Sequence, residues 1–202
     1  MIDGIVLAAG ASTRMGKSKA LLEIDGVTFL ERAVHLLRDA GCRYVVAVVD
    51  DDDWTERLAD VSGAAVVIND QPNAEQIDSL RLGLANLPDG GDGVLVLPVD
   101  FPRVAAETVK ALVAEFARGD AQILNAAYNG VAGHPVIFAR SIIPELMQPG
   151  LPDGARSVID AHKHDARSVE VDDPGVLIDV DTPEDYSKIT EENRDGNRDG
   201  KP

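Results

Sequence analysis

Residues 4–26 read GIVLAAGASTRMGKSKALLEIDG. The apolar run Ile5–Ala9 predicts a buried strand, and it leads directly into a glycine-containing loop. That loop carries the cations Arg14, Lys17 and Lys19, although the chain as a whole has a net charge of −16. Glycines allow a backbone to approach a ligand closely, and cations together with bare N–H groups bind polyphosphates well. The stretch therefore predicts a strand followed by a phosphate-binding loop.

The spacing of the glycines bears on which kind of phosphate-binding loop this is. Gly10 and residues 16–18 approach the P-loop pattern G-x-x-x-x-G-K-[ST], but five residues separate the two glycines where that pattern has four. The apolar run 94–99 is followed by Asp100. In P-loop proteins, too, an apolar strand ends in the aspartate that binds Mg²⁺. The extra residue changes which N–H groups converge on a phosphate, so a different phosphate-binding loop is the alternative.

Apolar runs alternate with helical patterns along most of the chain. Short runs rich in β-branched residues predict buried strands at Ile5–Ala9, Tyr44–Val49, Ala64–Ile68, Val94–Leu97 and Ile123–Ala127. Helical spacing of apolar residues predicts helices over Thr28–Ala40, Ser79–Leu87 and Ala105–Arg118, the first of them opened by a capping box. This alternation predicts an α/β fold, a three-layer sandwich with a mostly parallel, Rossmann-like sheet between helices. Two later runs, His134–Ala139 and Ser168–Val171, predict a small antiparallel extension.

Acidic residues near predicted strand ends are candidate metal ligands. Ligands of parallel sheets bind beyond the carboxyl ends of the strands, and Gly10 and Asp100 each lie just past such an end. Asp179 and Asp181 alternate along an extended segment and therefore share one face. Carboxylates at such a rim are typical ligands of Mg²⁺ beside substrate phosphates. Two other interpretations stay open: Asp100 caps a turn, or Asp181 caps a helix whose first turn contains Pro183.

Four segments together carry a family resemblance. The loop from Leu7 to Lys19 matches the pattern Leu-Ala-Ala-Gly-x-Ser-x-Arg-Met-Gly-x-x-Lys at every specified position. Residues 98–102, 133–138 and 179–186 read PVDFP, GHPVIF and DVDTPEDY. In this order the segments resemble the motifs of the molybdenum cofactor nucleotidyltransferases, and most of all those of the cytidylyltransferase branch. The resemblance extends over about residues 3–188.

The resemblance implies a glycosyltransferase-A-like fold, as in nucleotide-diphospho-sugar transferases, and a Mg²⁺-dependent nucleotidyltransferase. Such an enzyme moves a nucleoside monophosphate from a nucleoside triphosphate to a phosphorylated small molecule, here molybdopterin, and releases pyrophosphate. A molybdoenzyme is expected as a further partner. The implied residues are Arg14, Lys19 and Asp100 for catalysis, Asp100, Asp181 and Asp179 for the metal, His134 for the acceptor, and Leu7, Ala8, Ala9, Gly10, Ser12, Arg14, Lys19, Ser79, Arg81 and Gly83 for the nucleotide.

One residue indicates the preferred base, and one segment departs from the family pattern. Leu-Ala-Ala-Gly is the form associated with CTP and Leu-Ala-Gly-Gly the form associated with GTP, so Ala9 favours CTP. Residues 75–78 read EQID where similar enzymes usually have a glycine before the segment Ser79–Leu84. Because that segment helps to hold the base or ribose in the family, the departure leaves the choice of base open.

Three other functions are alternatives on the sequence alone. The first is a transferase of the same fold that acts on another acceptor, such as a sugar phosphate. The second is a P-loop-type kinase, which would release a nucleoside diphosphate. The third is a non-catalytic nucleotide-binding module, although the presence of both Asp100 and Asp181 argues against a loss of catalysis.

The composition argues against several classes of partner and site. Asp and Glu outnumber Lys and Arg by 35 to 19, which argues against nucleic acid or an anionic membrane as a partner. The single cysteine, Cys42, excludes an internal disulfide. No apolar run approaches the roughly 18 residues of a membrane span, and no basic leader precedes the first strand, so we expect a cytoplasmic protein. We expect one nucleotidyltransferase domain over residues 1–190 and a disordered polar tail over residues 191–202.

Overall fold

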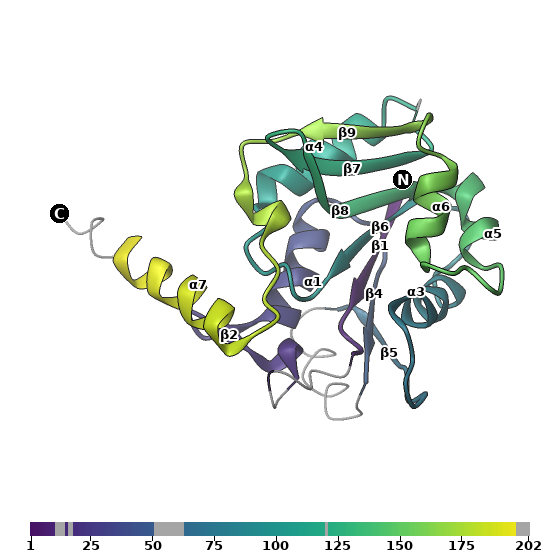
Figure 1. Ribbon diagram of the computed structural model, residues 1–202. Coiled ribbons are helices and arrows are strands. Elements are labelled where there is room, and N and C mark those ends of the chain that lie inside the picture. Colours follow the sequence, from purple (N-terminus) through teal and green to yellow (C-terminus); the bar gives the residue numbers. More distant parts are fainter. Residues whose placement is uncertain (11–14, 16–17, 51–62, 120, 197–202) are drawn as a thin grey trace.

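The fold is organised around a seven-stranded sheet. The computed structural model describes residues 1–10, 15, 18–50, 63–119 and 121–196. The strands of the sheet are β1 (Ile2–Leu7), β4 (Val45–Val49), β5 (Ala65–Ile68), β6 (Gly93–Pro98), β7 (Ile123–Tyr128), β8 (Val131–Ala139) and β9 (Ala166–Glu170). They lie side by side in the order β5-β4-β1-β6-β8-β7-β9 (Figure 1). A separate small sheet pairs β2 (Glu23–Ile24) antiparallel with β3 (Val27–Thr28).

Strand directions confirm the mostly parallel sheet that the sequence predicts. β1 pairs parallel with β4 and β6, and β4 pairs parallel with β5. Within this sheet only β8 runs against the other strands, because it pairs antiparallel with both β6 and β7. The turn between β7 and β8 is Asn129-Gly130, with φ angles of 51° and 75°. Asn and Gly tolerate positive φ at little cost, which suits them to a two-residue hairpin.

The last strand of the sheet corrects one prediction. The run Ser168–Val171 was expected in an antiparallel extension, and it is observed as β9, which pairs parallel with β7. Between β8 and β9 the chain passes through η3 (Arg140–Ile142), α5 (Ile143–Leu146) and α6 (Ala155–Ala161). A crossover that contains helices allows a strand to return parallel to an earlier one, whereas a tight hairpin produces an antiparallel pair.

Helices cover both faces of the sheet, which confirms the three-layer arrangement (Figure 1). On one face, α1 (Phe29–Asp39) and α4 (Ala106–Phe116) pack against a cluster that includes Val6 of β1. On the other face, α3 (Gln76–Ala85), α5 and α6 pack against a cluster that includes Ile5 and Leu7. Successive residues of β1 thus point to opposite faces, and both faces are buried.

Element boundaries show where local and tertiary effects act. Helix α1 begins as predicted, because Thr28 Oγ1 accepts from the N–H of Glu31 at 3.1 Å and the Glu31 carboxylate accepts from the N–H of Thr28 at 3.0 Å. Helix α3 begins at Gln76, three residues before the predicted Ser79. Strand β5 was expected to be buried, but its residues are exposed or half-buried because β5 is an edge strand.

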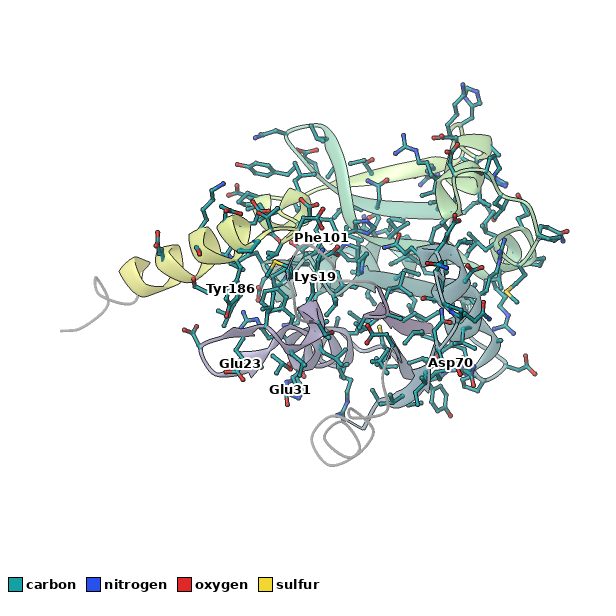
Figure 2. All side chains as sticks on the ribbon, turned by 60° about the horizontal axis from the view of Figure 1, so that its bottom comes forward. Lys19, Glu23, Glu31, Asp70, Phe101 and Tyr186 are labelled. Atoms are coloured by element: carbon teal, nitrogen blue, oxygen red, sulfur yellow. The ribbon has the colours of Figure 1, made fainter. Side chains whose placement is uncertain are left out.

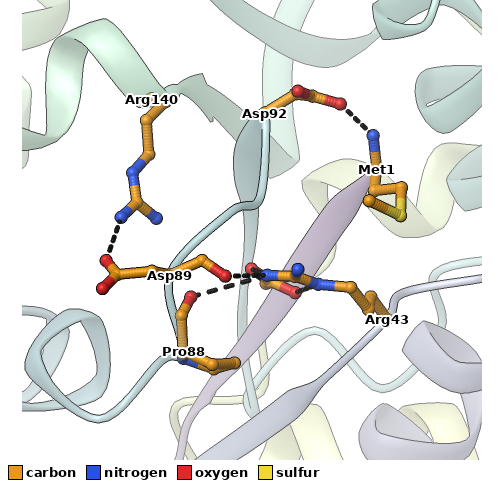
Figure 3. Close-up of polar contacts among 7 residues, drawn as sticks. Met1, Arg43, Pro88, Asp89, Asp92 and Arg140 are labelled. Carbon is orange, nitrogen blue, oxygen red and sulfur yellow. Dashed lines mark hydrogen bonds and ion pairs between the residues drawn. The ribbon is translucent and has the colours of Figure 1, made fainter.

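A buried ion pair fixes the amino ends of the central strands (Figure 3). Asp3 of β1 is 0% exposed, and its carboxylate accepts from Arg43 Nε at 3.0 Å and from Arg43 Nη2 at 2.9 Å. Arg43 Nη2 also donates to the carbonyl of Asp89 at 3.2 Å. Asp3 and Arg43 lie 40 positions apart in the sequence. The sequence pattern predicted a strand only from Ile5, because Asp3 interrupts the apolar run. The ion pair explains how β1 tolerates a buried charge.

The C-terminal helix α7 (Pro183–Gly196) extends away from the rest of the molecule (Figure 1). Residue 190, where the sequence places the end of the domain, lies within this helix, which reaches residue 196. Residues 197–202 lie outside the described part of the chain. Among the helices that are described, none combines the length and the apolar character needed to cross a bilayer.

Candidate functional site

The carboxyl ends of β1 and β6 border a pocket of about 200 Å³. Gly10 follows β1 and Asp100 follows β6, and both residues line this pocket. The N–H of Val99 donates to the carbonyl of Leu7 at 2.9 Å, which keeps the two strand ends together. The structure thus brings Gly10 and Asp100 to one rim of the sheet, as the sequence predicts. Leu7, Ala8 and Ala9, which were predicted to contact the nucleotide, line the same pocket.

The side chain of Lys19 joins two acidic residues that lie far from it in the sequence. Lys19 begins the short helix η1 (Lys19–Leu21), and its Nζ contacts Asp181 Oδ1 and lies 3.4 Å from Asp100 Oδ2. The N–H of Val180 donates to the carbonyl of Asp100 at 2.9 Å, which holds the C-terminal segment beside the end of β6. Lys19, Phe101 and Tyr186 mark this region in Figure 2. Three separate sequence motifs therefore meet around one ammonium group.

Helix α7, which follows this cluster, has a cap of its own. Thr182 Oγ1 accepts from the N–H of Asp185 at 3.2 Å, and the Asp185 carboxylate accepts from the N–H of Thr182 at 3.0 Å. Hydrogen bonds from Thr182 hold the pKa of Asp185 below its ordinary value. The interpretation in which Asp181 caps the helix is therefore wrong, because Thr182 occupies that position and the Asp181 carboxylate contacts Lys19.

Asp100 is half-buried, and the ammonium group of Lys19 lies beside its carboxylate. Burial raises the pKa of Asp100 above its ordinary value, while the positive charge of Lys19 and its hydrogen bond oppose that rise. Its Oδ1 is buried and has no hydrogen-bond partner among the described residues. A buried carboxylate oxygen without a partner is costly, so an incoming cation or hydrogen-bond donor would satisfy it. This observation favours a ligand role for Asp100 over a turn-capping role.

The donor set fits a divalent cation that is shared with a substrate. In the described part of the chain, no three His, Cys, Asp or Glu side chains are grouped so that they could hold a metal. Asp100 and Asp181 are nevertheless linked through Lys19. Mg²⁺ is commonly bound through one or two carboxylates together with substrate phosphates rather than by a complete protein cage. The negative charge of the third predicted ligand, Asp179, opposes the lowering of the pKa of His134, and its role as a metal ligand stays a prediction.

A second pocket, of about 280 Å³, adjoins the first and shares Leu7, Gln76 and Pro98 with it. His134 of β8 lines its wall, with its ring centroid 4.6 Å from that of Phe101. Burial lowers the pKa of His134 to about 4, so the imidazole is neutral at neutral pH. Its Nδ1 is buried without a hydrogen-bond partner in the described structure. His134 therefore offers this pocket a neutral ring, rather than a cation that could pair with a phosphate.

Gly133 lets β8 pass close to η4 (Pro174–Leu177). A Cβ atom at Gly133 would lie 2.1 Å from the carbonyl oxygen of Val176. The loop before η4 is itself fixed, because the Asp173 carboxylate accepts from the N–H of Gly175 at 2.9 Å and from the N–H of Ala105 at 2.8 Å. Only a residue without a Cβ fits here, which gives a packing reason for the glycine of the Gly-His-Pro segment.

We expect Gly133→Ala to destabilise the protein by about 1–3 kcal/mol, because β8 and η4 must move apart to admit the methyl group. Urea unfolding followed by circular dichroism measures this loss. The control is Val131→Ala on the same strand, where the residue is 55% exposed and a change within about 0.5 kcal/mol is expected. Equal stability of Gly133→Ala and the wild type would contradict the close approach.

A third pocket, of about 210 Å³, adjoins the first on its other side, and the two share Ala9, Gly10 and Ala74. Asn69 and Asp70, which follow the end of β5, line it, and Figure 2 labels Asp70. Sequence reasoning missed these residues and also Gln76, which lines the first two pockets. The rule that ligands bind past the carboxyl ends of parallel strands applies to β5 and would have indicated Asn69 and Asp70.

Three further residues predicted to bind nucleotide lie in helix α3 and contact other parts of the fold. Ser79 Oγ is buried and accepts from Asn69 Nδ2 at 2.9 Å. Arg81 Nε donates to the carbonyl of Leu146 at 3.0 Å, which ties α3 to the end of α5. A Cβ at Gly83 would lie 2.9 Å from Ile5 Cγ2, so this glycine allows α3 to pack closely on β1. The structure does not bring these three residues to the pocket beside Asp100.

Two predicted residues of the phosphate-binding loop, Ser12 and Arg14, lie outside the described residues. Lys17 lies outside them as well. Their roles stay predictions from the sequence.

A family model described as the MobA-like NTP transferase domain matches residues 4–166. The chain is 24% identical over 187 residues to the molybdenum cofactor cytidylyltransferase of Escherichia coli (strain K12), covering 92% of this chain and 93% of that protein. It is 35% identical over 111 residues to the molybdenum cofactor guanylyltransferase of Xanthomonas euvesicatoria pv. vesicatoria (strain 85-10), covering 55% and 53% of the two chains. The crystal structure of Rv0371C from Mycobacterium tuberculosis H37Rv in complex with manganese superposes with a TM-score of 0.76 at 27% identity, covering 94% and 98% of the chains.

Proposed function

Because the chain belongs to the MobA-like NTP transferase domain family, we propose that it transfers CMP from CTP to the phosphate of molybdopterin and releases pyrophosphate. Family membership makes the protein a nucleotidyltransferase and sets aside the P-loop-type kinase and the non-catalytic module. The observation that carries the finer proposal is the contact of Lys19 with both Asp100 and Asp181, because Lys19 and Asp100 line the pocket that also contains Gly10.

Three adjoining pockets supply one place for each part of the reaction. We assign the nucleoside to the pocket lined by Asn69 and Asp70, the phosphates to the pocket of Gly10 and Asp100, and the acceptor to the pocket of His134. An oxygen of the acceptor phosphate then attacks the α-phosphorus, a new P–O bond forms, and the bond to the pyrophosphate leaving group breaks. Holding both anions in line converts an encounter of two repelling molecules into a reaction within one complex.

Charge neutralisation is the second contribution of the protein. Lys19, together with Arg14 of the preceding loop, would bind the phosphates of the triphosphate. Asp100 and Asp181 would hold Mg²⁺, which supplies positive charge at the α-phosphate and at the leaving group when it is bound. The similar protein Rv0371C has been crystallised with manganese, which supports a divalent cation for this chain as well. Asp179 stays a predicted ligand of secondary importance.

The choice of CTP over GTP depends on the loop after β1 and on the start of α3. The curated relatives include a cytidylyltransferase and a probable guanylyltransferase that are both similar along nearly the whole chain, so the choice of base rests on the residues near the pocket. Ala9 lines the pocket assigned to the nucleoside, which supports a role for the Leu-Ala-Ala-Gly segment in reading the base. Backbone donors and acceptors left unpaired by the wrong base cost about 1–3 kcal/mol each. One such mismatch corresponds to a preference of roughly five- to 150-fold.

Pyrophosphate release tests the function directly. The purified protein is incubated with Mg²⁺, molybdopterin and one of CTP, GTP, ATP or UTP, and simple sugar phosphates replace molybdopterin in parallel reactions. We expect rapid pyrophosphate release with CTP and molybdopterin, slower release with GTP, and none without an acceptor. Equal or faster reaction with GTP would overturn the cytidylyl assignment, and reaction with a sugar phosphate alone would overturn the assignment of the acceptor.

A further inference from the structure

The ammonium group of Lys19 occupies the space between the two carboxylates assigned to the metal. Its Nζ contacts Asp181 Oδ1 and lies 3.4 Å from Asp100 Oδ2. The side chain of Lys19 is 16% exposed, and those of Asp100 and Asp181 are 25% and 39% exposed. The three side chains are therefore partly shielded from water. Charges in such a shielded site interact more strongly than charges at an open surface.

Two carboxylates held this close repel each other unless a cation lies between them. Lys19 supplies that cation from within the protein. A divalent cation that entered alone would have to displace the ammonium group from both acids. It would find only these two carboxylates there, because no larger cluster of metal-binding side chains is present in the described structure. A hard cation such as Mg²⁺ or Mn²⁺ needs further oxygen ligands, which phosphates provide.

We infer that Lys19 is an internal counter-ion that makes metal binding depend on the nucleotide. Without a triphosphate, Lys19 pairs with Asp100 and Asp181, reduces their mutual repulsion and excludes the divalent cation. When a metal–triphosphate complex enters, its phosphates attract the ammonium group and the two carboxylates become available to the metal. This inference rests on the proposed nucleotidyl transfer, but it adds an order of binding in which metal and nucleotide arrive together.

Binding of Mn²⁺ measured by electron paramagnetic resonance tests this order without any measurement of activity. For the wild type we expect Mn²⁺ alone to bind weakly, and at least tenfold more tightly when CTP is present. Lys19→Met should bind Mn²⁺ alone at least tenfold more tightly than the wild type. Lys19→Arg, which keeps the positive charge, should bind it as weakly as the wild type. The control is Lys188→Met, since Lys188 is 73% exposed and lies 3.9 Å from Asp185, outside the cluster, and no change is expected.

If Lys19→Met folds poorly, its melting temperature provides a second test. Its melting temperature should be lower than that of the wild type in metal-free buffer and should recover on addition of Mn²⁺, since the cation replaces the missing ammonium group. The inference is overturned if the wild type and Lys19→Met bind Mn²⁺ alone with equal affinity. In another outcome, Lys19→Met binds Mn²⁺ more tightly than the wild type does, but the wild type binds no Mn²⁺ even when CTP is present. The role of Lys19 as a counter-ion then stands, and the proposed function fails.

Discussion

Asp100→Asn is expected to slow nucleotidyl transfer by a factor of about 10² to 10³ or more while the protein stays folded. Asparagine has nearly the same shape but carries no negative charge, so it cannot hold a cation as the carboxylate does. The fold should survive, because the contact that anchors the C-terminal segment uses the backbone carbonyl of Asp100, which accepts from the N–H of Val180.

The rate of pyrophosphate release with CTP, Mg²⁺ and acceptor measures this loss, and circular dichroism checks that the variant is folded. The control is Asp172→Asn, which removes an exposed acid from the loop before η4 and should leave the rate within a factor of about two of the wild type. Transfer at a near-normal rate in Asp100→Asn would contradict the assignment of Asp100 to the metal.

Arg43→Ala is expected to reduce the free energy of unfolding by about 3–5 kcal/mol, although Arg43 lies far from the pockets. The reason is the partner that it leaves behind: Asp3 is fully buried and would lose both of its hydrogen bonds to the guanidinium group. An unpaired buried carboxylate must either stay charged in an apolar surrounding or take up a proton, and both cost free energy.

Urea unfolding at neutral pH measures the effect, with Arg140→Ala as the matched control. Arg140 belongs to the same group of polar contacts in Figure 3, but its partner Asp89 is fully exposed at 104% relative side-chain area. Exposed pairs contribute little, so this control should lose less than about 1 kcal/mol. A loss of that size in Arg43→Ala as well would contradict the stabilising role of the buried pair.

Predictions that depended on neighbouring residues proved accurate. The capping box of Thr28 and Glu31 needs only one turn of chain, and it is present as predicted. Gly10 and Asp100 meet because each follows an apolar strand, and parallel strands in one sheet end at the same rim. The motif from Leu7 to Lys19 also identified the family correctly. Its residues are contiguous, so they can be recognised without knowledge of the fold.

Features that depend on distant partners were not predictable from periodicity or motifs. The side chains of Ser79 and Arg81 contact Asn69 and the end of α5, which belong to other segments of the chain, and a nucleotide role for the two residues stays a prediction. The direction of β9 depends on how the crossover from β8 packs, which periodicity does not encode. The neutrality of His134 arises from burial against Phe101, and burial depends on the whole fold.

The sequence by itself determined the α/β class, the family and the residue types that the chemistry needs, because each of these is written in short runs and contiguous motifs. The tertiary structure alone decided that Lys19 contacts Asp181, 162 positions away, and that Asp3 is paired with Arg43, 40 positions away. Such pairings depend on which chain segments the packed sheet brings together. The energy of a charge depends on the groups that surround it in space, and these groups come from segments that are separate in the sequence.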